Sequence, residues 1–254
     1  MKVSAIVISH GHADELAHSL PALAPQVDEL LVIANLPGSI PANLPPGVHV
    51  LENARPLSFA ANANLGAAHT EHELVLIANP DALPEPDAVE ILRAFMEEHP
   101  RTGVVGPQML YNDGTWQASR RGFPTVGATI VRRTPLRFLF PPLRWQRRHY
   151  LLDERPEEPT PTDTMLGAFL LLRRTMLDEI GGWDPGFRMY CEDIDLNYRA
   201  AKAGWERWYV PGAVVHHEYA AVVDKRFLTR HTLWHARAMA RFLRKHPERL
   251  LVLR

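Results

Sequence analysis

The chain has little of what marks several classes of protein. Its 254 residues include one cysteine, Cys191, which excludes an internal disulfide and is typical of a reducing compartment. No apolar run approaches the roughly 20 residues of a membrane-spanning helix. The formal net charge is −1, which excludes a global attraction to nucleic acid. We therefore expect a cytoplasmic protein with no nucleic-acid partner.

Charge is uneven along the chain. Residues 132–148 hold six arginines and no acid, inside a Pro- and Arg-rich stretch, 132–161, with little regular pattern. A structureless loop of that length inside a compact domain is usually functional or mobile. Residues 225–254 hold nine Lys or Arg against one acid, Glu248, in a helical pattern. Three interpretations of this basic helix stay open: packing on the body, a dimer contact, or peripheral contact with the inner face of a membrane.

The order of apolar runs predicts an α/β fold. At 46% hydrophobic and 22% charged residues, the chain can bury one large core. Strand and helix patterns alternate in the first hundred residues, which predicts a mostly parallel central sheet flanked by helices. The expected strands are residues 3–8, 29–34, 48–51, 73–78, 103–110, 168–172 and 208–215, and the expected helices are 14–23, 58–69, 86–99, 175–180 and the stretch from 192 to 204.

A turn with one carboxylate follows the fourth predicted strand. Asn79-Pro80-Asp81 must end that strand, so Asp81 should project from the carboxyl edge of the sheet. Open α/β sheets bind ligands at this edge. A lone carboxylate there can hold Mg²⁺ or Mn²⁺ together with phosphate oxygens. The simpler interpretation is an aspartate that caps the next helix.

A second acidic feature, Glu192-Asp193, begins a helical pattern. Acids in a first turn stabilise the helix dipole, whatever the function. A carboxylate at this place can also serve as a general base that takes a proton from a sugar hydroxyl. Adjacent helical residues point about 100° apart, so one of the two takes that role and the other supports it.

Histidines and a glycine-rich turn surround these acids. His216 and His217 follow a predicted strand, and alternation sends them to opposite faces, so one of them can enter a site and complete a metal shell with Asp81. Trp183 and Asp184 lie in a glycine-rich turn, where we expect contact with substrate. Ordinary core and surface roles compete with each of these assignments.

Taken in order, several segments make the sequence resemble a known family. They are VSAIVISH at the start, SFAANANLG (58–66), LIANPD (76–81), GAFLLLRR (167–174), GGWDPGFRMYCEDIDLNYR (181–199) and VPGAVVHH (210–217). The chain resembles the family 2 glycosyltransferases, and most closely their bacterial rhamnosyltransferase-like branch. The resemblance covers nearly the whole chain and depends on the order and spacing of the motifs.

The resemblance implies a GT-A fold with a Rossmann-like nucleotide half. The catalytic domain would be residues 1–224, with a nucleotide-sugar half (1–110) and an acceptor half (111–224), followed by a helical extension (225–254). The implied reaction is inverting and uses Mg²⁺ or Mn²⁺. It moves a hexose or deoxyhexose, rhamnose-like or mannose-like, from a nucleoside diphosphate sugar to a glycan, lipid-linked or small-molecule hydroxyl.

The resemblance also assigns roles to individual residues. Asn79-Pro80-Asp81 takes the place of the family's metal motif, with Asp81 the ligand. Asp193 matches the catalytic base, with Glu192 as its neighbour. His216 falls where some members supply a further metal ligand, although the choice between His216 and His217 is open. The residues expected to border the nucleotide are Ser9, His10, Asn35 and Asn62.

The chain departs from the family pattern after its second strand. The family usually has Asp-Asn there, and this chain has Ala34-Asn35, which puts recognition of a uracil- or thymine-type base in doubt. Ser58 stands where glycine is common. The lost carboxylate keeps a sugar-binding pseudoenzyme as an alternative. A nucleotidyltransferase is a weaker one, because His10-Gly11-His12 makes a poor phosphate loop.

Overall fold

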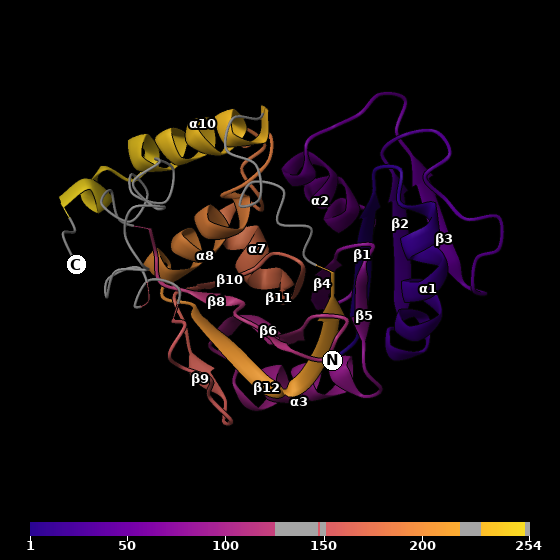
Figure 1. The fold of residues 1–254 in the computed structure, drawn as a ribbon, viewed down its shortest axis with the longest axis horizontal. Coiled ribbons are helices and arrows are strands. Elements are labelled where there is room, and N and C mark those ends of the chain that lie inside the picture. The colour runs from indigo at the N-terminus through magenta and orange to yellow at the C-terminus, as the bar shows by residue number, and fades with distance from the viewer. Residues whose placement is uncertain (125–146, 148–150, 219–229, 252–254) are drawn as a thin grey trace.

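The structure is a computed structural model, and it describes residues 1–124, 147, 151–218 and 230–251. Its centre is a ten-stranded sheet with helices on both faces (Figure 1). The main path of the sheet runs β3-β2-β1-β4-β11-β6-β12-β5. The predicted α/β architecture is confirmed.

The N-terminal half is a parallel α/β unit in which β1 pairs with β2 and β4, and β2 pairs with β3. Two helices connect its strands, and both boundaries and order agree closely with the sequence pattern. The elements are β1 (Val3–Ser9), α1 (Ala13–Leu23), β2 (Glu29–Ala34), β3 (Val48–Glu52), α2 (Phe59–Ala68) and β4 (Leu74–Ala78).

Strand alternation explains why helices cover both faces of this unit. Val3 and Val7 of β1 belong to one core cluster, which includes Leu20 of α1. Ile6 of β1 belongs to a second cluster, which includes Ala63 of α2. Apolar residues on both sides of a strand are typical of a buried parallel sheet, because each face packs against its own helices.

The C-terminal half continues the sheet with mixed directions. β11 runs antiparallel to both β4 and β6, whereas β12 runs parallel to β6. The sheet is therefore mostly, but not wholly, parallel. Its elements are α3 (Ala88–Glu98), β6 (Thr102–Leu110), β11 (Phe169–Arg173), α7 (Arg174–Ile180), α8 (Glu192–Lys202) and β12 (Glu206–His217).

Five short strands lie where the sequence shows no strand pattern. Two or three residues are too few to establish a period of two, so only the fold reveals them. The Pro- and Arg-rich stretch 132–161 lies mostly outside the described residues. The short strands are β5 (Ala82–Pro84), β7 (Trp116–Gln117), β8 (Arg120–Arg121), β9 (Thr160–Pro161) and β10 (Thr164–Met165).

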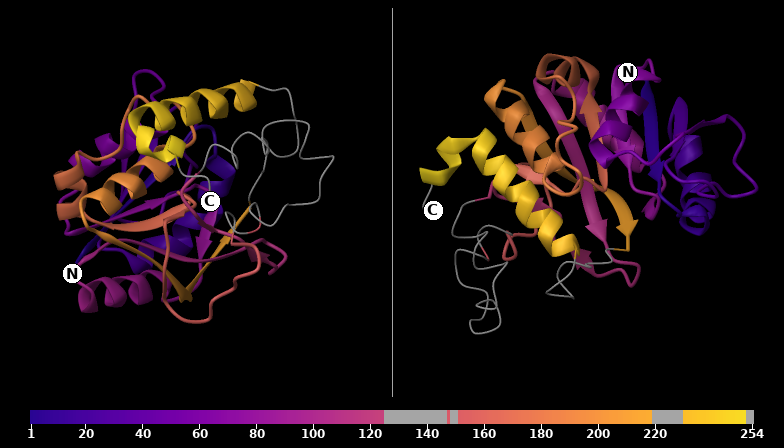
Figure 2. Two further views of the ribbon diagram at one scale, coloured as in Figure 1. Left: turned by 90° about the vertical axis from the view of Figure 1, so that its left-hand side faces the viewer. Right: turned by 90° about the horizontal axis from the view of Figure 1, so that it is seen from above.

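The basic C-terminal segment forms α10 (Arg230–Lys245) and a final 3₁₀ turn, η2 (Pro247–Leu251). α10 lies across α8 in the views of Figures 1 and 2. Its Phe242 is fully buried in a third core cluster, together with Tyr198 of α8. Among the helices of the described residues, none is long and apolar enough to cross a membrane.

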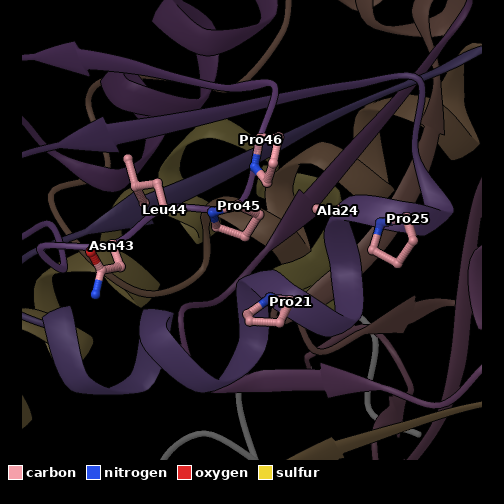
Figure 3. Close-up of a pocket in the computed structure, with 7 residues that line it drawn as sticks. All are labelled: Pro21, Ala24, Pro25, Asn43, Leu44, Pro45 and Pro46. Atoms are coloured by element: carbon pink, nitrogen blue, oxygen red, sulfur yellow. The ribbon is translucent and has the colours of Figure 1, made fainter.

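One hollow, of about 580 Å³, lies beside the end of α1 and is shown in Figure 3. None of its lining residues has an ionisable side chain, and none is a predicted site residue. It therefore offers no acid, base or metal ligand. The lining residues are Pro21, Ala24, Pro25, Asn43, Leu44, Pro45 and Pro46.

Candidate active site

Asp81 and His217 meet where β4 ends. Asn79-Pro80-Asp81 carries the chain from β4 into β5, and Ala82 of β5 pairs with His217, the last residue of β12. The Nε2 atom of His217 lies 3.6 Å from Oδ1 of Asp81 and 3.4 Å from Nδ2 of Asn79. Asp81 thus does project from the carboxyl edge of the sheet, and it leads into a strand rather than capping a helix.

The ring of His217 is held in one orientation by Gln117 of β7. Gln117 Oε1 accepts a hydrogen bond from Nδ1 at 3.1 Å, and Gln117 Nε2 donates to the His217 carbonyl at 3.3 Å. Nδ1 therefore carries the proton, and the Nε2 lone pair faces Asp81. Burial lowers the pKa of His217, although the charge of Asp81 opposes this, so the imidazole is neutral at pH 7.

His216 lies on the other face of β12. Its Nε2 is 3.0 Å from Oε1 of Glu85, on the surface. This corrects the assignment of His216 as the neighbour of Asp81: strand alternation brings His217 there instead. From the sequence alone we could predict only that one of the two histidines enters the site, because the sequence does not show which face of the strand turns toward Asp81.

The donors beside Asp81 suit a divalent ion. A metal-bound histidine generally donates its second ring N–H to an acceptor, as His217 does to Gln117. The Oδ1 atom of Asp81 and the Nε2 atom of His217, which lie 3.6 Å apart, would both hold the ion. Within the described residues no group of three or more His, Cys, Asp or Glu could hold a metal. Phosphate and water oxygens would complete the shell.

Asp193 is placed by the first turn of α8. Its Oδ1 accepts from the Ile194 amide at 2.8 Å, and its Oδ2 accepts from the Gly167 amide at 3.2 Å. A Cβ at Gly167 would lie 3.2 Å from the Cβ of Asp193, so glycine permits this close approach. Burial raises the pKa of Asp193 and outweighs these hydrogen bonds. A carboxylate with a raised pKa and free lone pairs can accept a proton.

Glu192 differs from its neighbour in having an unpaired oxygen. The residue is half-buried, but its Oε2 is buried and has no hydrogen-bond partner in the described part of the chain. Burial first, and then the charge of Asp193, raises the pKa of Glu192 to about 8. At neutral pH its carboxyl group is therefore protonated and can donate a hydrogen bond.

The backbone before this acid pair is strained. Tyr190 and Cys191 have φ angles of 73° and 64°, in the left-handed region that residues other than glycine seldom adopt. Each such residue costs on the order of 1 kcal/mol. Such strain persists only where the surrounding structure holds it.

Two backbone contacts join the Asp81 side to the Asp193 side. The amide of Asn79 donates to the carbonyl of Ala168 at 2.8 Å. The amide of Gly167, the residue before Ala168, donates to Oδ2 of Asp193. The turn before β11 therefore lies between the two carboxylates. The structure brings Asp81, His217 and Asp193 to one end of the sheet.

A third group of residues forms an amide network at the ends of β1, β2 and β3. Asn53 Nδ2 donates to Oδ1 of Asn35 at 2.9 Å and to Oδ1 of Asn62 at 2.6 Å. Asn35 also donates to Nδ1 of His10 at 3.0 Å, and Ser9 is buried beside it. All four predicted nucleotide-border residues thus lie together. Sequence reasoning missed Asn53, although its place directly after a predicted strand was a usable signal.

Trp183 and Asp184 are not exposed to a ligand in the way we expected. Trp183 is 2% exposed and belongs to a core cluster, and its amide bonds to Asn64 of α2 at 2.8 Å. Asp184 accepts from Arg241 and Lys245 of α10. Burial opposes the ionisation of Asp184, but its hydrogen bonds outweigh this and lower its pKa to about 2. Both residues hold the turn in place instead.

Comparison with known proteins decides the family. The family model described as "Glycosyltransferase like family 2" matches residues 34–244. The chain belongs to this family. Its relatives include the N-acetylglucosaminyl-diphospho-decaprenol L-rhamnosyltransferase of Mycobacterium tuberculosis, 36% identical over 149 residues, or 57% of this chain and 47% of the relative. Rhamnosyltransferase WbbL of Escherichia coli K12 is 36% identical over 92 residues, 35% of this chain and 34% of that protein.

Solved structures confirm the GT-A fold for this family 2 chain. GalNAc-T7 with UDP, GalNAc and Mn²⁺ matches with a TM-score of 0.69 at 15% identity, over 96% of this chain and 48% of the other. The mannosyltransferase PcManGT of Pyrobaculum calidifontis with GDP-Man and Mn²⁺ matches with a TM-score of 0.55 at 15% identity, over 87% and 58%. The chain spans about half the length of the first curated relatives it matches.

Proposed function

We propose that this family 2 chain is an inverting, divalent-metal-dependent glycosyltransferase. It moves a hexose or deoxyhexose, rhamnose-like or mannose-like, from a nucleoside diphosphate sugar to a hydroxyl of a glycan, lipid-linked or small-molecule acceptor. The observation that carries the proposal is the neutral imidazole of His217 facing Asp81 at the sheet edge where Asp193 also lies. The names of the two relatives, both rhamnosyltransferases, support the sugar class.

In this proposal each group has one task. Asp193 takes the proton of the acceptor hydroxyl while that oxygen attacks the anomeric carbon from the face opposite the leaving diphosphate. Glu192, whose carboxyl group is protonated at neutral pH, adds no second negative charge beside Asp193 and can orient the acceptor through its other carboxyl oxygen. Asp81 and His217 would hold Mg²⁺ or Mn²⁺, which supplies positive charge to the leaving diphosphate.

The nucleotide would lie over the amide network. Ser9, His10, Asn35 and Asn62 border the carboxyl ends of β1 and β2, where open α/β sheets bind ligands. Asn79 and Asp81 stand at the end of the adjacent strand, β4, which suits a diphosphate that extends from the base toward the metal. Asn53 is added to this set because it orients both Asn35 and Asn62.

A peripheral membrane contact through α10 remains part of the proposal, in narrower form. Two of its cations, Arg241 and Lys245, bind Asp184 and are not available to lipid. The outer positions Leu233 and Arg237 are exposed. A lipid-linked acceptor, of the kind named for the mycobacterial relative, would bring such a face to a membrane.

The test is a donor panel. UDP-, dTDP- and GDP-linked sugars are incubated with the chain, with and without Mn²⁺, and release of the nucleoside diphosphate is followed. Slow hydrolysis of one donor that stops on chelation is the expected result. If every donor stays intact with a range of hydroxyl acceptors while donors still raise the melting temperature, the chain is a binding protein and the proposal is wrong.

A further inference from the structure

The strained turn before the acid pair lies at the end of a longer segment. The first residues of this segment are bound by α10. We name residues 183–191 the entry segment. Asp184 accepts from Nη2 of Arg241 and from Nζ of Lys245, each at 2.9 Å. The side chain of Asp184 is 15% exposed, whereas Arg241 and Lys245 are 45% and 31% exposed, so the two cations cover the carboxylate from the solvent side.

Aromatic contacts hold the rest of the entry segment to the same helix. Phe187 is 1% exposed, and the guanidinium of Arg241 lies 5.3 Å from its ring. Arg188 lies 4.8 Å from the ring of Trp234 on α10. The ring of Tyr190, the first strained residue, is 5.5 Å from that of His235 on α10. The contacts thus follow the segment up to its strained end.

Arg241 of α10 can lie close to the backbone in the middle of the entry segment because residue 186 is glycine. A Cβ built at this position would collide with the guanidinium of Arg241. The side chain of Arg241 therefore lies directly over the backbone of the entry segment. The entry segment connects α7 to α8. Figure 2 shows α10, in yellow, running alongside these orange helices.

Lys245 also reaches α8 itself. Its Nζ lies 2.9 Å from Oδ2 of Asp195, a residue of α8 that is fully buried and two positions after Asp193. The neighbouring His246 places Nε2 2.9 Å from the other oxygen of Asp195, and Arg199 also binds this carboxylate. One ammonium group therefore joins Asp184, before the strained turn, to Asp195, after it.

We infer that Lys245 of α10 is a positioning residue for the transfer reaction. By bridging Asp184 and Asp195, it fixes both ends of the strained turn and so sets the place of Asp193 and Glu192. This inference rests on the proposed function, since it names a residue that acts on the same acid pair. The C-terminal helix is then part of the catalytic unit rather than an appendage.

The structure offers variants that isolate this role. In Lys245→Met, Asp195 keeps Arg199 and His246, and Asp184 keeps Arg241, so no buried carboxylate loses all its partners. Lys245→Arg restores a cation at the same place. Arg244→Met is the matched control, because Arg244 is an exposed cation one residue away and forms no ion pair within the described ranges.

The experiment measures kcat and donor KM for the four proteins, together with hydrogen–deuterium exchange of the peptide that spans residues 183–193. We expect Lys245→Met to lower kcat at least tenfold with donor KM within twofold, and to speed exchange of this peptide. Lys245→Arg should return kcat to within about threefold of the unsubstituted chain. Arg244→Met should change neither quantity.

Two results would overturn the inference. One is a kcat for Lys245→Met within twofold of that for Arg244→Met. The other is a lowered melting temperature with unchanged exchange in residues 183–193, which shows a general loss of stability. If Lys245→Met does not fold, Lys245→Gln takes its place, since it also removes the charge that joins Asp184 to Asp195 but keeps a polar group beside them. If the unsubstituted chain transfers no sugar, the proposed function fails, and the exchange measurement still tests the bridge.

Discussion

The imidazole of His217 presents its unprotonated Nε2 to Asp81 at 3.6 Å, with Gln117 fixing the opposite ring nitrogen. In the proposed function this arrangement would offer a divalent ion one carboxylate oxygen and one neutral nitrogen. The side chain of His217 is 5% exposed and that of Asp81 is 29% exposed, so the imidazole is set in the protein while the carboxylate faces solvent. A ligand can therefore reach the pair from the carboxylate side.

His217→Ala should weaken metal binding and so raise the Mn²⁺ concentration that transfer requires, whereas His216→Ala should not. Gln117→Leu, which removes only the partner that orients His217, should raise the Mn²⁺ concentration for half-maximal activity by about 10- to 100-fold, and loss of the ligand itself in His217→Ala should raise it further. The measurement is a Mn²⁺ titration of donor hydrolysis. His216 is the matched control, because it lies next to His217 in the same strand but bonds to Glu85. A larger effect at His216 would move the metal to the other face of β12.

Asp193→Asn should abolish transfer and leave donor binding intact. The amide keeps the shape of the side chain but cannot take a proton, so kcat should fall by about 10² to 10⁴, the usual contribution of a general base. Donor affinity, measured by calorimetry, should stay within about twofold, since the proposal gives Asp193 a contact with the acceptor hydroxyl and none with the nucleotide. Asp178→Asn, at an exposed acid of α7, is the control. Near-normal turnover in Asp193→Asn would remove it as the base.

The raised pKa of Glu192 predicts that stability falls as the pH rises. The folded chain keeps a proton on Glu192 up to about pH 8, whereas an ordinary glutamate releases it near 4.5. The contribution of this group is fully present below pH 4.5, and it is lost as the pH rises through 8, because the unfolded state then binds fewer protons. Glu192→Gln should remove this slope.

Urea unfolding at pH 5, 6.5 and 8.5 tests this prediction. Relative to Glu192→Gln, the unsubstituted chain should lose on the order of 1 to 3 kcal/mol of unfolding free energy between the lowest and highest pH. Glu98→Gln, at an exposed carboxyl, should follow the unsubstituted chain. Parallel curves for all three proteins would mean that Glu192 ionises normally when folded.

The sequence predicted the sheet well because its signals are local. The run ELLVIA is β2, residue for residue, and the alternation of Val3, Ala5 and Val7 with Ile6 and Ile8 divides β1 between two cores. Strands of two residues, such as β7, are too short to show the alternation of apolar and polar residues that marks a strand in a sequence. They form because β6 offers them an edge, which is a tertiary cause.

The sequence placed the two acids of the candidate site correctly in the fold but did not indicate the residues that hold the site's side chains. Asp81 and Asp193 stand beside turn-forming residues, so sequence alone could place them at a sheet edge and a helix start. The role of Asp184 was different: a lone aspartate in a glycine-rich turn suggests a ligand contact, and only the fold brings Lys245, 61 residues away, to its side. Gln117 and His217 likewise meet across 100 residues.

Ala34→Asp tests which base the nucleotide pocket accepts. Ala34 ends β2 beside Asn35 and is 4% exposed, in a position where the resemblance leads us to expect a carboxylate. A carboxylate there would accept from the N3–H of uracil but face the lone pair of N3 in cytosine. The ratio of UDP to CDP affinity should therefore rise about tenfold, because hydrogen-bonding sites discriminate strongly against a mismatched partner. Calorimetric titration of both nucleotides measures it, and Ala34→Asn, which adds the same bulk without charge, is the control. An unchanged ratio in Ala34→Asp would mean that the base is read elsewhere, and the amide network of Asn35, Asn53 and Asn62 would then be the next place to substitute.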